Sequence, residues 1–161
     1  MEKNDKYRII FKINNNSNQL YKIIKNKISN NHLLINKYND MLIHTNKKNV
    51  VITSAVRTAV GTLGGSLKNM QGHDLGSIVI REVLKRSKIK LNEVDEVIMG
   101  QVLTGSAGQN PARQAAIQAG LPIDKTAYVI NQVCGSGLRS VAAGYQAIMS
   151  NDANIIVAGG Q

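Results

Sequence analysis

From residue 50 onward, short runs rich in β-branched residues alternate with segments whose apolar residues recur at helical spacing. The strand-like runs cover residues 50–56, 94–103, 127–133 and 155–158, and helical patterns begin near residues 74, 110 and 138. Apolar runs this short, rich in Val and Ile, are typical of buried strands. The order βαβαβαβ therefore predicts an α/β fold with a mixed, mostly parallel sheet that helices cover on both faces.

The expected helices differ in how clearly their ends are marked. Asp74 is expected to cap the first helix, whose apolar positions are Leu75, Ile78, Val79, Val83 and Leu84. The second helix has Asn110 as its expected N-cap, Pro111 at its first position and Gly120 at its end. The third helix has a broad apolar face made of Leu138, Val141, Ala142, Tyr145, Ile148 and Met149. Small residues on the inner faces predict close packing.

The first 49 residues have a different composition from the rest. They carry 10 Lys and Arg against 3 Asp and Glu, together with 12 of the 18 Asn, so most of the formal charge of +10 lies there. Such composition predicts a disordered, Asn/Lys-rich extension over residues 1–49, followed by a folded domain over residues 50–161. Within the extension, the apolar residues Ile9, Ile10, Phe11 and Ile13 fit either a short strand or half a helical turn.

Three functions compete for this extension. A mitochondrial presequence is basic but poor in acids, and the single Arg8 with the early Glu2 and Asp5 fits it weakly. A nucleic-acid-binding arm needs clustered basic and aromatic residues, which are scattered here, so no nucleic-acid partner is expected. The favoured interpretation is an extension without a specific function, in which His32 and His44 are solvated.

The chain has one cysteine, Cys134. One cysteine excludes a disulfide framework and a cysteine-rich zinc site, and it fits a reducing compartment. A cytoplasmic location is therefore favoured, with a mitochondrial one if residues 1–49 act as a presequence. Because no run of ~18 apolar residues occurs, no membrane-spanning segment is expected, and no metal site is expected either.

Cys134 is the sharpest feature of the sequence, because an apolar strand runs into it and Gly135 and Gly137 permit a tight turn into a helix. The thiol is thereby expected at the carboxyl end of a strand, where open α/β sheets bind ligands. The positive end of the following helix favours the thiolate, and its free amides could hold an oxyanion. A buried, inert cysteine and a phosphate-binding loop are the alternatives; the nucleophile is favoured.

A nucleophilic cysteine needs a base, and the folded segment offers only His73. Its place at the start of a helix favours a capping or surface role, as does the neighbouring Asp74. The residues therefore predict a nucleophile with half an oxyanion site and no partner that accepts its proton.

Six runs in residues 50–161 together resemble the amino-terminal part of the thiolase family, most of all its acetyl-CoA acetyltransferases. They are residues 54–58 (SAVRT), 64–67 (GGSL), 100–103 (GQVL), 109–116 (QNPARQAA), 131–140 (NQVCGSGLRS) and 157–161 (VAGGQ). The resemblance implies a thiolase-like fold, here an incomplete amino-terminal half. It also implies that Cys134 takes the acetyl group as a thioester, and that the Cys134 amide donates to the oxyanion that forms on the attacked thioester. Acetyl-CoA, acetoacetyl-CoA and CoA would be substrates, with no tightly bound cofactor.

The family also implies parts that these 161 residues lack. They include a CoA-binding loop region, a fifth strand, and a second half with a catalytic His in Gly-His-Pro and a second Cys in Cys-x-Gly. No CoA-binding residue is assigned. The resemblance further implies a homo-oligomer in which residues 128–133 pair with the same strand of a second subunit. Two functions follow: a thiolase-type acyltransferase that is inactive as this chain alone, or a non-catalytic truncated fragment that pairs with a full-length subunit.

Overall fold

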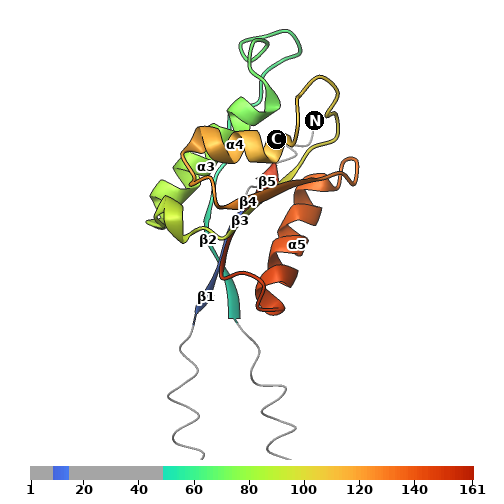
Figure 1. Ribbon diagram of the computed structural model, residues 1–161. Helices are drawn as coiled ribbons and strands as arrows, with labels where there is room; N and C mark the ends of the chain where they lie inside the picture. The colour runs from blue at the N-terminus through green and yellow to red at the C-terminus, as the bar shows by residue number, and fades with distance from the viewer. Residues whose placement is uncertain (1–8, 15–48) are drawn as a thin grey trace, which may run out of the picture.

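The computed structural model describes residues 9–14 and 49–161 (Figure 1). Expectations about the rest of the extension, including His32 and His44, lie outside these residues. From residue 49 on, the elements follow the predicted βαβαβαβ order. The elements are β1 (Ile9–Asn14), β2 (Asn49–Ala55), α3 (Gly72–Ser87), the 3₁₀ turn η1 (Leu91–Glu93), β3 (Glu96–Gly100), α4 (Pro111–Ala119), β4 (Thr126–Ile130), α5 (Ser136–Met149) and β5 (Ile155–Gly160).

The strands form one mixed sheet in the order β2-β1-β5-β3-β4. β3 lies in the middle of the parallel part and pairs with β4 on one side and β5 on the other. β1 runs antiparallel to both of its neighbours, β5 and β2. The predicted mixed, mostly parallel sheet is therefore confirmed.

β1 comes from the Asn/Lys-rich segment and yet lies inside the sheet. Of the two structures that fit its apolar residues, the strand is the one that forms. Its backbone pairs Lys12 with Ile155 of β5 and with Val51 of β2. Among the described strands, β2 pairs with β1 alone, so β1 joins β2 to the rest of the sheet.

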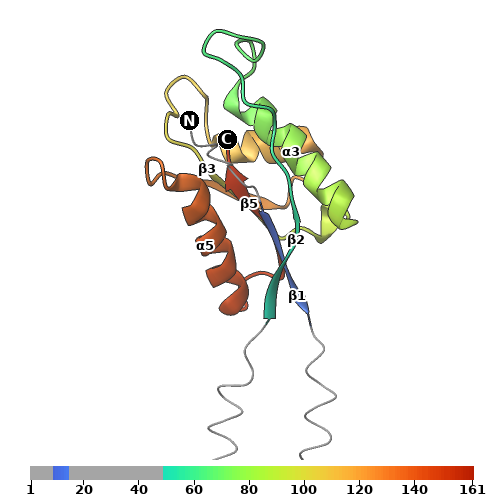
Figure 2. The same cartoon turned by 180° about the vertical axis from the view of Figure 1, so that it is seen from behind.

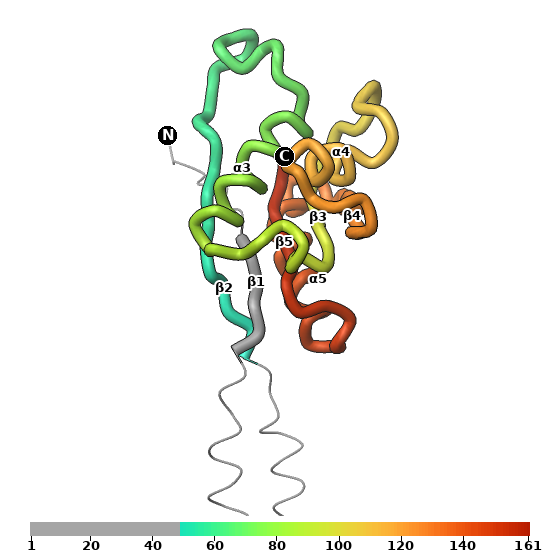
Figure 3. The backbone as a smooth tube through the Cα atoms, turned by 60° about the vertical axis from the view of Figure 1, so that its left-hand side comes forward, coloured from blue at the N-terminus to red at the C-terminus, as the bar shows by residue number. Residues whose placement is uncertain are grey.

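Helices cover both faces of the sheet, as predicted. α3 and α4 pack together over one face and α5 lies over the other (Figures 1 and 2). The tube in Figure 3 shows the same layers from the side, with α3 and α5 separated by the strands. Alternation along β3 divides the core: Val97 and Met99 pack with the α3 and α4 side, whereas Ile98 packs with Ile148 of α5.

Two local expectations are wrong. The run at residues 50–56 reads as a buried strand, but β2 lies at the outer edge of the sheet and Ile52 is 53% exposed. The N-cap of α3 is Gln71 rather than Asp74. Asp74 sits one turn later, and its Oδ2 accepts a hydrogen bond from the Gln71 amide at 2.8 Å, which forms a capping box. α4 matches its prediction, with Asn110 as N-cap, Pro111 at its start and Gly120 as C-cap.

α5 packs on the sheet mainly through small residues, together with Ile148. Its buried positions are Ser136, Ser140, Gly144 and Ile148, whereas Leu138 is 75% and Tyr145 45% exposed. The reason is close approach: a Cβ on Gly160 would lie 3.4 Å from Gly137 Cα. The predicted close packing through small residues is confirmed here. Of the predicted apolar face, Ile148 is buried and Val141 packs partly buried against the core, whereas Leu138 and Tyr145 are exposed. No helix within residues 49–161 is long and apolar enough to span a bilayer.

Candidate active site

The carboxyl ends of three strands meet at one edge of the sheet. Gly100 at the end of β3 is in register with both Ile130 of β4 and Gly160 of β5. The segment that joins β4 to α5 starts at this edge, at the upper end of α5 in Figure 1. Ligands of open α/β sheets bind in this position, because the loops beyond the strand ends form a crevice there.

Cys134 lies in that joining segment, two residues before α5 begins. Its thiol is free and exposed, so the structure does not agree with a buried, inert cysteine. The predicted strand at residues 127–133 ends early, at Ile130, because the chain turns away from the sheet at Asn131. The thiol is therefore presented beyond the strand end, on a turn rather than within the sheet.

The strain of this turn falls on Val133 and not on a glycine. Val133 has φ +49°, in the left-handed region, whereas Gly135 has φ −83°. A β-branched residue rarely adopts that conformation. The flanking glycines matter instead for close approach: a Cβ on Gly135 would lie 3.3 Å from the Gln132 carbonyl oxygen.

Two side chains hold the backbone on either side of Val133. Asn131 Oδ1 accepts a hydrogen bond from the Val133 amide at 3.0 Å, while its Nδ2 donates to the Val102 carbonyl at 3.1 Å. Ser136 Oγ accepts from the Gln132 amide at 2.9 Å and donates to the Val133 carbonyl at 2.5 Å. Both peptide groups that flank Val133 are thus fixed by side chains from the two ends of the turn.

The remaining hydrogen bonds of the turn are made by the backbone. The amides of Gly135 and Ser136 donate to the carbonyls of Gln132 and Val133 at 3.0 and 3.1 Å. In the described residues, these hydrogen bonds and those made by side chains leave the Cys134 amide unused. An amide in that position, beside the thiol and at the start of a helix, can donate to an anion that forms on an atom attacked by the sulfur.

His73, the one histidine of the folded segment, is not joined to Cys134 by any hydrogen bond or ion pair among the described residues. The sequence favours a capping or surface role for it; it lies in the first turn of α3, where Gln71 is the N-cap, with its side chain 14% exposed. Its Nε2 is 3.7 Å from Asp74 Oδ1, and its buried Nδ1 has no hydrogen-bond partner. Within residues 49–161, no three His, Cys, Asp or Glu side chains are grouped to hold a metal ion.

A cleft of about 410 Å³ opens elsewhere, between the end of β2 and α3. Arg57, Thr58, Glu82 and Arg86 supply its polar lining, and Cys134 is not part of it. Arg86 Nε donates to Glu82 Oε1 at 2.6 Å, and this hydrogen bond is the main reason that the pKa of Glu82 lies below its ordinary value. The cleft is thus separate from the turn that carries the thiol.

Asn110 and Arg113 fill structural positions. Asn110 Oδ1 accepts from the Arg113 amide at 3.1 Å, and its Nδ2 donates to the Ala127 carbonyl at 2.8 Å, which joins α4 to β4. The Arg113 guanidinium donates to the carbonyls of Lys125 and Ile123. Asn110 therefore caps α4 as predicted, and Arg113 ties the start of α4 to the segment that precedes β4.

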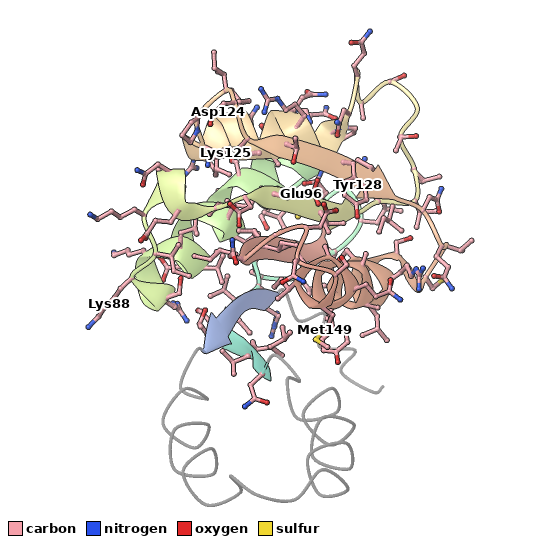
Figure 4. All side chains as sticks on the ribbon, turned by 60° about the horizontal axis from the view of Figure 1, so that its bottom comes forward. Lys88, Glu96, Asp124, Lys125, Tyr128 and Met149 are labelled. Carbon is pink, nitrogen blue, oxygen red and sulfur yellow. The ribbon has the colours of Figure 1, made fainter. Side chains whose placement is uncertain are left out.

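β4 forms the end of the sheet beside the Cys134 turn. Tyr128 lies near Glu96 of the adjoining β3, as Figure 4 shows. Burial first, and then the Glu96 carboxylate, raise the pKa of the Tyr128 hydroxyl above its ordinary value.

This fold and this turn define the class of the protein. Residues 50–161 match the N-terminal domain of the thiolase family, and the chain belongs to that family. Its relatives include acetyl-CoA acetyltransferases of Rhizobium meliloti (strain 1021), 58% identical over 111 residues, and of Cupriavidus necator, 59% identical over 112 residues. A solved structure, the Bacillus anthracis acetyl-CoA acetyltransferase, superposes with a TM-score of 0.66 at 40% identity.

The matched region covers most of this chain but only a small part of each relative. It covers 69% and 70% of this chain but 28% of each of the two bacterial relatives. For the Bacillus anthracis structure it covers 68% of this chain and 28% of the other. The chain thus spans about 28% of the length of the relatives that it matches.

Sequence reasoning identified Cys134 but missed the residues that shape its turn. The positive φ of Val133 has no sequence signal, because a valine normally argues against it. The roles of Asn131 and Ser136 were open to inference, since both residue types commonly bond to nearby backbone groups in turns.

Proposed function

We propose that Cys134 is the acyl-accepting nucleophile of a thiolase-type reaction. The observation that carries the proposal is an exposed thiol on a turn at the carboxyl end of the sheet, within the segment that is 58% identical to an acetyl-CoA acetyltransferase. The acyl donor would be acetyl-CoA. The complete reaction would join two acetyl-CoA molecules into acetoacetyl-CoA and CoA, or run in reverse.

The first step is a transfer of the acetyl group. The Cys134 thiol first loses its proton to solvent, which the positive end of the following helix favours. The resulting thiolate attacks the thioester carbon of acetyl-CoA and forms a C–S bond, while the bond to the CoA sulfur breaks and CoA leaves as a thiolate. Negative charge develops on the carbonyl oxygen, and the unused Cys134 amide would stabilise it. In the second step, a second acetyl-CoA that has lost a methyl proton attacks the acetyl group, forming a C–C bond and releasing the Cys134 thiolate.

The two steps make different demands on the described residues. Acetyl transfer needs a thiolate and an oxyanion donor; the Cys134 turn supplies the sulfur and the amide, and solvent takes the thiol proton. Condensation needs a base for the methyl proton, and no histidine within residues 49–161 is joined to the thiol by a hydrogen bond or ion pair. We therefore infer that this chain takes an acetyl group but does not turn over.

Acetyl transfer is tested by mixing the chain with excess acetyl-CoA and locating the added group by mass spectrometry. The expected result is one acetyl group on Cys134 that hydroxylamine removes. The Cys134→Ser variant controls for acetylation of lysines, which is insensitive to hydroxylamine. The proposal fails if Cys134 stays unmodified under conditions that acetylate the Cupriavidus necator enzyme.

A second candidate function is non-catalytic pairing with a full-length thiolase subunit through β4. The observation that favours it is the position of β4 as the last strand of the described sheet, with Tyr128 38% exposed. An end strand of this kind has unpaired backbone groups that another strand can bond. The inferred partner is the matching strand of a homologous subunit.

Native mass spectrometry of the chain mixed with a full-length acetyl-CoA acetyltransferase tests this pairing. Tyr128→Lys places a charge at the strand edge and should abolish a mixed dimer. Tyr145→Lys changes a comparably exposed tyrosine on α5 and should leave it intact. Absence of a mixed dimer with the unaltered chain would exclude this function.

A further inference from the structure

A small number of hydrogen bonds holds the turn that carries Cys134 in a strained backbone conformation. Val133, the residue before the cysteine, has φ +49°. A non-glycine residue in that region is strained and persists only where its surroundings hold it. Val133 is itself exposed, so its own side chain adds little to this restraint. The restraint must come from the hydrogen bonds at its two peptide groups.

The Ser136 hydroxyl makes two hydrogen bonds to the turn, in addition to the bond from the Ser136 amide to the Val133 carbonyl. Its side chain is almost fully buried, at 4% exposed, and its Oγ bridges the Gln132 amide and the Val133 carbonyl. One atom acts as acceptor for the first group and as donor to the second. A hydroxyl has both capacities, whereas a methyl group has neither. An alanine there would leave both backbone groups without that partner.

Asn131 supplies the bond on the strand side. Its Oδ1 accepts from the Val133 amide, and its Nδ2 ties the turn to the Val102 carbonyl beyond β3. The peptide groups before and after Val133 are therefore held by Asn131 and Ser136 together. The hydrogen bonds that Asn131 and Ser136 make to the turn do not involve the Cys134 thiol.

We propose that Ser136, assisted by Asn131, is a positioning residue that holds the Val133 turn and thereby aims the Cys134 thiol at the acyl donor. This inference rests on the proposed function of Cys134 as the acyl acceptor. Ser136 touches no reacting atom and acts through the backbone alone. Loss of its hydroxyl lets the turn relax, so the thiol and the Cys134 amide lose their common alignment.

The test compares Ser136→Ala with Ser140→Ala. Ser140 is a matched control, because it lies one turn further along α5, is fully buried, and donates from its hydroxyl to the Gly137 and Gly159 carbonyls rather than to the turn. Both variants lose buried hydrogen bonds of one helix and should fall similarly in thermal stability. Two rates then separate them: hydrogen exchange at the Gln132 amide and acetyl transfer to Cys134.

Ser136→Ala is expected to quicken exchange at the Gln132 amide by about tenfold, as loss of one hydrogen bond allows. It should slow acetyl transfer by about 100-fold, the scale of a misplaced reacting group. Alkylation by iodoacetamide, a small reagent with little demand on alignment, should stay near the rate of the unaltered chain. Ser140→Ala should leave all three rates close to those of the unaltered chain. Equal acetyl-transfer rates in the two variants would overturn the inference.

Two further outcomes are also decisive. If the unaltered chain takes no acetyl group, the proposed function fails. The role of Ser136 in restraining the turn is then tested by hydrogen exchange at the Gln132 amide, which must quicken in Ser136→Ala and not in Ser140→Ala. If Ser136→Ala does not fold, Asn131→Ala replaces it, since Asn131 is exposed and its loss removes the other anchor. Unchanged exchange at the Val133 amide in Asn131→Ala would then overturn the inference.

Discussion

Because residue 100 is a glycine, the start of α5, directly after the Cys134 turn, can pack closely against the end of β3. The added Cβ of an alanine there would meet the Ser136 backbone and the Gly137 amide nitrogen, which belong to the first turn of α5. Backbone cannot move aside as a flexible side chain can, so the start of the helix must shift. The position therefore couples the end of β3 to the geometry around the thiol.

Gly100→Ala is predicted to lower the free energy of unfolding by about 1–3 kcal/mol, the usual cost of overpacking a close contact. Urea denaturation measures this change. Gly105→Ala is the matched control, because a Cβ at Gly105 meets nothing within 4 Å, and its midpoint should stay near that of the unaltered chain. Equal midpoints for the two variants would contradict the close approach.

Asn110 combines a helix cap with a backbone conformation that disfavours most side chains. Its φ is +46°, and its Oδ1 accepts from the Arg113 amide. Asn110→Ala loses the cap and keeps the left-handed strain, so the free energy of unfolding should fall by about 1–2 kcal/mol. Asn110→Gly loses the cap but relieves the strain, so it should fall by about 0.5 kcal/mol. The reverse order in urea denaturation would contradict the left-handed cap.

Among the elements, β1 is the one that sequence patterns predicted least well. Its apolar residues fit a strand or half a helical turn, because four apolar positions in five residues have no clear period. Its partners are β5 and β2, and β5 lies more than 140 residues away along the chain. Local propensity has no information on such distant pairing, so the place of β1 inside the sheet could not be inferred.

Lys12→Pro is predicted to release β2 from the sheet. Proline lacks an N–H and is poorly tolerated in a strand with neighbours on both sides, and Lys12 pairs with both β5 and β2. Loss of these bonds should lower the free energy of unfolding by about 1–3 kcal/mol. Hydrogen exchange should quicken in β2 and at residues 155–158, and less between β3 and β4. Lys12→Ala keeps the N–H and should match the unaltered chain; equal exchange in both variants would contradict the pairing.

For α5, the sequence did not predict which face of the helix is buried, and the reason differs from that for β1. Helical periodicity correctly predicted the helix and its broad apolar face. The start of α5, however, approaches Gly100 and Gly160 so closely that small residues face the sheet there, and Ile148 is buried further along the helix. The outer side thus retains Leu138 and Tyr145 in exposed positions. Which face of a helix is buried depends on the depth of its contact with the sheet, and no single-helix pattern encodes that depth.

For the whole molecule, the alternation of strands and helices was sufficient to predict the layers, and the Cys134 motif was sufficient to predict where the thiol lies. The caps of α4 followed from Asn110, Pro111 and Gly120. Two details that could not be predicted, the edge position of β2 and the insertion of β1, arise from contacts between distant segments. The strained φ of Val133 is held by local hydrogen bonds, but valine itself gives no signal of it. Sequence patterns thus predicted the elements, whereas their mutual contacts determine the geometry of the site.

Turnover of acetoacetyl-CoA requires a base near the Cys134 thiol as well as the thiol itself. Because His73 is not joined to Cys134 within residues 49–161, this chain should show no thiolysis of acetoacetyl-CoA above the uncatalysed rate. Consumption of acetoacetyl-CoA in the presence of CoA, followed by absorbance, measures this, and the full-length Cupriavidus necator enzyme serves as the active control. Cys134→Ser should match the unaltered chain in this assay, although only the unaltered chain is expected to accept an acetyl group. Turnover that Cys134→Ser abolishes would mean that a base acts within these 161 residues, and His73→Gln would identify or exclude His73 as that base.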